Sequence, residues 1–286
     1  MPPHNHFSDS ILLDHGSAAD NLELLALSTL MEEVGISHSD SLKSLISASQ
    51  QWRRRPGQER WEMQDLSLTP DKHEAVMEHL KTLNLVDELL PSSTHYEYTL
   101  LLGATVPRME RRLNHLARLW QEGVRFNNIV FLVGQRPLND GIDKTDCLIA
   151  NSIGKQAQGQ RAEAARPLTE TEGAMQLFAS MKLPEAMKKL PVAFIDSPRV
   201  WKRDHWQRAN TRDTLIRWMK ESPAPGKTLV ISDQPHAHYQ LEVVKQELPE
   251  TFKPEVAAQS ADENTQVILY LDALALWLHN LQLRLN

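Results

Sequence analysis

Cysteine is almost missing from this sequence, and its scarcity removes several kinds of chemistry. Cys147 is the one cysteine among 286 residues. No disulfide can therefore form within the chain, and no cluster of thiolates can hold a metal ion. Cys147 follows the polar residues 143–146, and no base stands at a recognisable spacing from it. We therefore assign it no catalytic role.

The sequence also lacks long apolar runs and clusters of basic residues. Its N-terminus has neither the basic start nor the apolar run of a secretory signal, and no segment approaches the roughly 18 apolar residues of a membrane span. The net charge is -6, whereas a general nucleic-acid-binding surface needs clustered Lys and Arg. We expect the arginine run 53–55 to be a solvated loop. The sequence therefore predicts a cytoplasmic protein that binds neither membranes nor nucleic acid.

Three common active-site motifs are absent as well. The sequence contains no G-x-x-x-x-G-K-[ST] segment, which disfavours P-loop phosphate transfer. No G-x-G-x-x-G follows the first predicted strand, so an ordinary dinucleotide site is not supported. The lack of a G-x-S-x-G segment argues against an α/β-hydrolase.

The first third of the chain has the pattern of a helical region. Residues 1–19 are polar and show no period, which predicts a flexible tail. Residues 20–95 are predicted to form an N-terminal helical region, because leucines recur at helical spacing in 20–51. Thr69 followed by Pro70 is typical of the start of a further helix.

From residue 96 onwards, short apolar runs alternate with amphipathic segments. This alternation is typical of an α/β fold, and we predict a Rossmann-like, doubly wound, mostly parallel sheet over residues 96–286. The polar stretch 139–167 is expected to be a surface excursion, and 201–208 an aromatic, basic loop. The predicted strands are 99–102, 128–133, 192–195, 227–231 and 255–259. The predicted helices are 107–121, 169–181, 210–220, 235–246 and 264–285.

Small or polar residues follow four of the predicted strands. Because the carboxyl ends of parallel strands meet at one edge of a sheet, these residues are expected to converge on one ligand site. Glycine there lets the backbone approach a ligand, and a helix N-terminus after the first strand favours an anion. The residues are Gly103, Ala104, Thr105, Gly134, Gln135, Asp196, Ser232, Asp233 and Gln234.

Several charged side chains near these strand ends could serve a ligand. Arg108 and Arg136 are candidate cations for a phosphate or carboxylate, although Arg108 equally fits a surface arginine. Glu172 stands three residues after Thr169, so it either completes a capping box or acts as a base or ribose ligand. Asp196 and Asp233 could bind hydroxyls or cap the helices that follow them. No metal ligand is assigned.

A histidine and three tryptophans complete the set of candidates. His236 is predicted at a helix start, where the helix dipole favours the neutral ring, and it is the candidate catalytic histidine. His238, two residues on, points in another direction on a helix, so the pair cannot share a metal there. We interpret Trp201, Trp206 and Trp218 as packing residues rather than as a platform for stacking bases.

The order of these motifs, over about residues 98–259, resembles the DUF218 family. The resemblance implies a Rossmann-like fold, and the lack of an anchor is similar to the family's soluble branch. It also implies S-adenosylmethionine as the first candidate ligand. The matching segments are Leu102-Gly103-Ala104, Arg108 or Arg111, Val133-Gly134-Gln135, Glu172-Gly173-Ala174, Asp196, Asn210-Thr211-Arg212-Asp213-Thr214 and Ser232-Asp233-Gln234-Pro235-His236. The chain departs from the family pattern at Gln135, Asp213-Thr214 and Tyr239.

The sequence therefore predicts a protein that binds an anionic or nucleotide-like small molecule at the carboxyl ends of its strands. Asn210, Thr211 and Asp213 join the binding residues through the resemblance. One alternative is hydrolysis or transfer at a phosphoryl group, with His236 and either Glu172 or Asp233 in the chemistry. A second alternative is a non-enzymatic interaction protein, such as a homodimer, that acts through its N-terminal helices.

Overall fold

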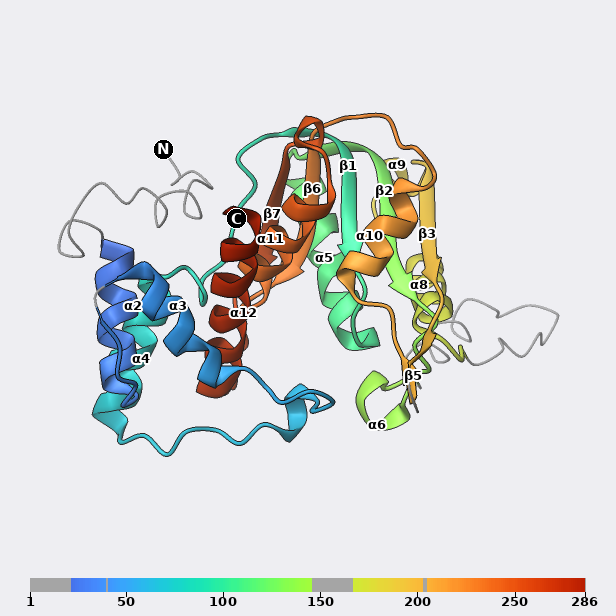
Figure 1. The fold of residues 1–286 in the computed structure, drawn as a ribbon. Helices are drawn as coiled ribbons and strands as arrows, with labels where there is room; N and C mark the ends of the chain where they lie inside the picture. Colours follow the sequence, from blue (N-terminus) through green and yellow to red (C-terminus); the bar gives the residue numbers. More distant parts are fainter. Residues whose placement is uncertain (1–21, 40, 146–166, 203–204, 286) are drawn as a thin grey trace. The chain divides into compact units, whose positions relative to one another are not determined.

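The computed structural model describes residues 22–39, 41–145, 167–202 and 205–285 (Figure 1). The predicted tail, Cys147 and most of the predicted surface excursion lie outside these ranges. The chain divides into two compact units. The sheet unit comprises Ser93–Ile231 and Glu247–Glu255, and the helical unit comprises Met1–Ser92, Ser232–Gln246 and Val256–Asn286. The chain therefore passes between the two units several times, and the predicted boundary at residue 95 lies close to the first of these passages.

A five-stranded sheet confirms the predicted α/β class and its Rossmann-like, mostly parallel character. Its order is β3-β2-β1-β6-β7, in which β6 and β7, the last two strands of this sheet along the chain, follow β1, as in doubly wound folds. Strand β1 pairs in parallel with β2 and with β6, and β2 pairs in parallel with β3. The strands are β1 (His95–Leu102), β2 (Arg125–Gly134), β3 (Val192–Ser197), β6 (Thr228–Asp233) and β7 (Pro254–Gln259).

Helices cover both faces of the sheet unit, which explains why its strands read as continuous apolar runs. On one face, Tyr98 of β1 packs edge-to-face against Trp218 of α10, with ring centroids 5.2 Å apart. On the other face, Phe131 of β2 packs against Phe178 of α8 at 5.8 Å. The helices of this unit are α5 (Val106–Gln121), α6 (Asp140–Asp143), α8 (Glu170–Ser180), α9 (Glu185–Lys188) and α10 (Thr211–Met219).

Two predicted helix starts are confirmed in detail. Thr169 caps α8 by accepting a hydrogen bond from the Glu172 N–H, and the Glu172 carboxylate accepts one from the Thr169 N–H. Asn210 and Asp213 exchange the same pair of bonds at the start of α10. Both capping boxes satisfy backbone donors that a helix would otherwise leave free.

The predicted aromatic loop at 201–208 is wrong for the described residues on either side of 203–204, because they pair as two short antiparallel strands, which we call the hairpin. Its strands are β4 (Val200–Lys202) and β5 (His205–Gln207), and Trp201 stands opposite Trp206. Packing is confirmed for Trp218, which is buried. Trp201 and Trp206 contact each other but remain exposed.

The helical unit is built from both ends of the chain. The predicted helices of the first third are α2 (Leu22–Glu33), α3 (Leu42–Ser49) and α4 (Pro70–Thr82). They share one apolar core with α12 (Val267–Leu285), which contributes the fully buried Trp277 and Leu278. Helix α11 (Ala237–Glu247) precedes β7. Within the described part of the chain, no helix combines the length and the apolar character that crossing a bilayer takes.

Candidate functional site

The carboxyl ends of β1 and β2 approach each other closely in the sheet unit. The Gly103 N–H donates a 2.8 Å hydrogen bond to the Leu132 carbonyl, so the two strands stay paired up to the turn. Gly134 ends β2, and a Cβ atom built there would lie 2.9 Å from the Ser197 carbonyl of β3. Glycine is therefore needed at this position because the neighbouring backbone fills the space.

Arg136 is held by an acidic partner rather than left open to a ligand. Its Nη1 and Nη2 each lie 2.9 Å from one carboxylate oxygen of Asp143, and Nη2 also donates to the Ala104 carbonyl at 3.0 Å. Arg136 is 9% exposed and Asp143 is fully buried. The predicted cation therefore joins the turn after β1 to the turn after β2.

Asp143 also fills the helix N-terminus at which we predicted an anion. Its Oδ1 accepts a hydrogen bond from the Val106 N–H in the first turn of α5, at 3.1 Å, and its Oδ2 accepts one from Asn139 at 2.8 Å. Burial opposes ionisation of Asp143, but bonds from Arg136 and the backbone outweigh it and lower the pKa of this carboxyl. The chain itself thus supplies an anion there. Arg108 lies half-buried in the same turn of α5.

Glu170, the first residue of α8, is a buried carboxyl that the sequence reasoning missed. It is 8% exposed, and burial raises its pKa to about 7, even though Arg136, Arg208 and the Gly134 N–H favour the ionised form. The sequence feature that could have indicated Glu170 is the capping box. That motif commits Glu172 to the helix start, so the acid two residues earlier is the one left to face the strand ends.

Gly103 gives Glu170 the space it occupies. A Cβ atom built on Gly103 would lie 2.6 Å from Glu170 Oε1 and 3.0 Å from the Leu132 carbonyl. We expect Gly103→Ala to lower the free energy of unfolding by about 1–3 kcal/mol, as other overpacked sites do. Urea denaturation would measure it. Gly141→Ala, at an exposed position of α6 where a built Cβ atom would lie 3.3 Å from Asn139 Oδ1, is the matched control and should change stability little. Equal effects of the two changes would contradict the proposed crowding.

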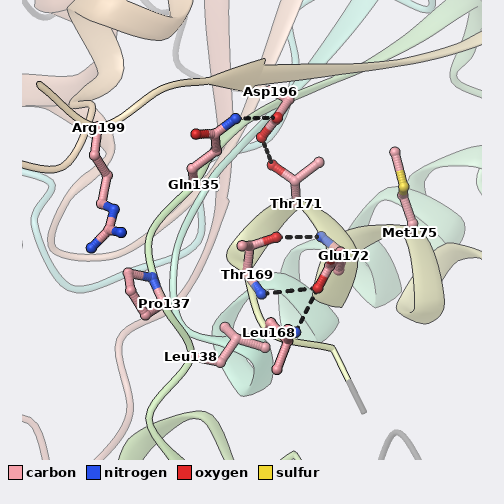
Figure 2. A pocket seen from close by; sticks show the side chains of 10 residues that line it. All are labelled: Gln135, Pro137, Leu138, Leu168, Thr169, Thr171, Glu172, Met175, Asp196 and Arg199. Carbon is pink, nitrogen blue, oxygen red and sulfur yellow. Dashed lines mark hydrogen bonds between the residues drawn. The ribbon is translucent and has the colours of Figure 1, made fainter. Parts of the chain in front are cut away.

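Asp196 of β3 is fixed from two sides while staying exposed. Gln135 Nε2 donates to its Oδ2 at 2.8 Å, and the Thr171 hydroxyl lies 2.6 Å from its Oδ1 (Figure 2). The same hydroxyl is 3.2 Å from the Gly134 carbonyl. Side chains from the ends of β2 and β3 and from the start of α8 therefore hold one carboxylate in a single orientation.

An open hollow of about 790 Å³ lies over this carboxylate. Glu172 lines it, but its Oε2 is engaged by the Leu168 and Thr169 backbone N–H groups, which confirms the capping-box alternative (Figure 2). The side chains around the hollow are two acids, one amide, two threonines, one arginine and four apolar groups. They are Gln135, Pro137, Leu138, Leu168, Thr169, Thr171, Glu172, Met175, Asp196 and Arg199.

The four predicted residues at the end of β6 and just after it belong to the helical unit, where they are buried. Ser232 Oγ donates to the Gln240 amide oxygen, and Gln234 Nε2 donates to the Asn84 carbonyl at 2.8 Å. Asp233 and His236 are almost fully buried. These bonds hold the segment within its own unit. Asn210, Thr211 and Asp213, in contrast, lie at the start of α10 in the sheet unit.

Tyr239 connects His236 to a charged cluster of the helical unit. The His236 and Tyr239 rings lie 5.8 Å apart, and the Tyr239 hydroxyl accepts a 2.9 Å hydrogen bond from Arg60. Arg60 Nε in turn lies 3.5 Å from the fully buried carboxylate of Asp272. The position that holds arginine in the DUF218 pattern thus holds a tyrosine that binds an arginine from the N-terminal third.

No protein-family model matches this chain, and the search of curated proteins found no match either. The resemblance to the DUF218 family therefore rests on the order of its motifs and stays a prediction. Among the described residues, no three His, Cys, Asp or Glu side chains gather in a way that could hold a metal ion.

The hollow offers a defined set of interactions. Asp196 is an oriented, exposed carboxylate, which suits it to accept hydrogen bonds from neutral donors such as hydroxyls. Arg199 places a guanidinium on the same rim. Exposed apolar surface comes from Leu168 and Met175. These groups together suit a small molecule that carries hydroxyls, a negative charge and an apolar part.

Proposed function

We propose that the hollow at the ends of β2 and β3 binds a nucleotide-like small molecule. The observation that carries the proposal is Asp196, which Gln135 and Thr171 hold in one orientation at the carboxyl end of a strand. Ligands of doubly wound folds lie outside these strand ends, and an acidic side chain there commonly binds ribose hydroxyls. Asp196 is the corresponding acceptor in this proposal.

Arg199 supplies the positive charge of the proposed site. Arg199 was not among the residues predicted from the sequence, whereas the predicted cation Arg136 already forms two hydrogen bonds with Asp143. An adenosyl compound with a carboxylate or phosphate would place its ribose diol on Asp196 and its anionic group near Arg199. S-adenosylmethionine is the first candidate because of the DUF218 resemblance, and it has both the diol and the carboxylate.

Titration calorimetry of the full chain tests the proposal. The ligands are S-adenosylmethionine, adenosine nucleotides and ribose 5-phosphate. Asp196→Asn keeps the shape of the side chain but removes its charge, so we expect about 10- to 100-fold weaker binding, since hydrogen bonds to a charged group are worth about 1.5–3 kcal/mol. Glu221→Gln, which makes the same charge change at an exposed position of the sheet unit, should leave the affinity unchanged.

Two results would overturn the proposal. One is that none of these ligands binds the wild-type chain. The other is that Asp196→Asn binds them as tightly as wild type, because the carboxylate would then play no part in recognition.

A further inference from the structure

The β4–β5 hairpin presents two tryptophans that the core does not use. Trp201 and Trp206 stand opposite each other, with ring centroids 5.2 Å apart and planes inclined by 73°. They are 54% and 55% exposed, and the neighbouring Val200 is exposed as well. The hairpin therefore carries an apolar, aromatic surface directly after the end of β3.

Part of this arrangement has a structural reason. Each strand of the hairpin has three residues, and so short a hairpin gains stability from an aromatic pair across its strands. An edge-to-face pair uses one edge and one face, which leaves further ring surface open. A structural role alone thus accounts for the contact between Trp201 and Trp206 but not for the exposure of both rings.

Arg199 makes the aromatic surface continuous with the hollow. It lines the hollow, and its guanidinium carbon lies 5.2 Å from the centroid of the Trp206 ring. This cation–π contact places the Trp206 ring at the rim of the proposed site, with the Arg199 guanidinium over it. A ligand that fills the hollow and extends past Arg199 meets the indole next.

We propose that the hairpin is the ring-binding part of the same site, and that its anionic ligand contains a nucleoside. The sugar hydroxyls lie on Asp196, and the base stacks on Trp206. This proposal rests on the proposed function and narrows its ligand class. Stacking on an aromatic side chain is possible for every base, and it contributes substantially to affinity in other proteins. The hairpin therefore favours a ligand with a base over a sugar phosphate alone.

The test compares two ligands that share the ribose but differ in the base. Adenosine 5'-monophosphate and ribose 5-phosphate are titrated into the full-length wild type, Trp206→Ala and Trp206→Phe. We expect Trp206→Ala to bind adenosine 5'-monophosphate about tenfold more weakly or worse. The affinity for ribose 5-phosphate should stay unchanged, and Trp206→Phe should recover most of the loss because it keeps an aromatic ring.

The outcomes separate this proposal from the one on which it rests. If Asp196→Asn weakens both ligands while Trp206→Ala weakens neither, the hollow binds the sugar and the ring-binding role is refuted. Equal weakening of both ligands by Trp206→Ala would show that the indole only supports the rim. If Trp206→Ala converts a dimer to a monomer in light scattering without affecting binding, the hairpin is an interface between copies of the chain, which also overturns the proposal. Failure of both ligands, and of S-adenosylmethionine and the other adenosine nucleotides as well, to bind wild type would overturn both proposals.

Discussion

Replacing Asp143 with alanine is expected to lower the free energy of unfolding by about 3–5 kcal/mol, the usual cost of breaking a buried ion pair. Arg136 would remain buried with its guanidinium uncompensated by this carboxylate. The N–H groups of Val106 and Asn139 would lose their acceptor at the same time. Urea denaturation of both proteins at neutral pH would measure the difference.

A double variant separates the charge from the packing in this prediction. Arg136→Met combined with Asp143→Leu removes both charges and keeps similar volumes. Replacing a whole buried pair in this way is often close to neutral, so the double variant should be clearly more stable than Asp143→Ala. A loss below about 1 kcal/mol in the single variant would match an exposed pair instead. Such a result would contradict the buried link between the turns after β1 and β2.

Glu170→Gln is expected to stabilise the protein above neutral pH. The pKa of Glu170 is about 7 in the folded protein, against an ordinary value of 4.5. Between these values the folded state keeps a proton that the unfolded chain releases, so this group's contribution to stability falls as pH rises through the window. The glutamine side chain of the variant has no proton to release. At pH 8 the variant should therefore be more stable than wild type, by up to about 3 kcal/mol.

The measurement is the difference between the two unfolding free energies at pH 5, 6, 7 and 8. Burial lowers the pKa of His115 and His238 to about 4, and these groups make stability rise with pH between about 4 and their ordinary value. Both histidines are present in both proteins, so their effect cancels in the difference. A difference that stays constant across this range would show that Glu170 titrates normally. Glu221→Gln, at an exposed position of the sheet unit, controls for the loss of one acidic side chain.

The sheet could be predicted from the sequence because its strands are buried on both faces. Such strands appear as short apolar runs, and Gly103 or Asp196 marks where they end. Capping residues such as Thr169 likewise marked helix starts. The hairpin was missed because three residues a strand are too few to show a period. Its tryptophans do alternate with polar residues, as in a half-buried strand, but so short an alternation could not be distinguished from a loop.

The site was harder to predict because its contacts join residues through irregular turns. Asp143 lies seven residues after Arg136, and nothing in that spacing indicates a buried pair. Glu170 sits beside a capping threonine, so the pattern drew attention to Glu172 instead. Contacts between residues far apart in the sequence are harder still to predict. Gln50 donates a hydrogen bond to the carbonyl of Ala275, 225 residues away, and a single sequence carries no sign of such a bond.

The shared core of α2, α3, α4 and α12 has a consequence for how the protein is made. Leu27, Leu30 and Leu80 are synthesised before the sheet unit, whereas Trp277 and Leu278, which complete their packing, are synthesised after it. The whole sheet unit is synthesised in between, so it can acquire its structure first. Until α12 has been synthesised, the apolar faces of α2, α3 and α4 cannot complete their packing. During this interval the exposed apolar faces make the nascent chain prone to aggregation, which binding by chaperones or rapid synthesis of α12 would limit.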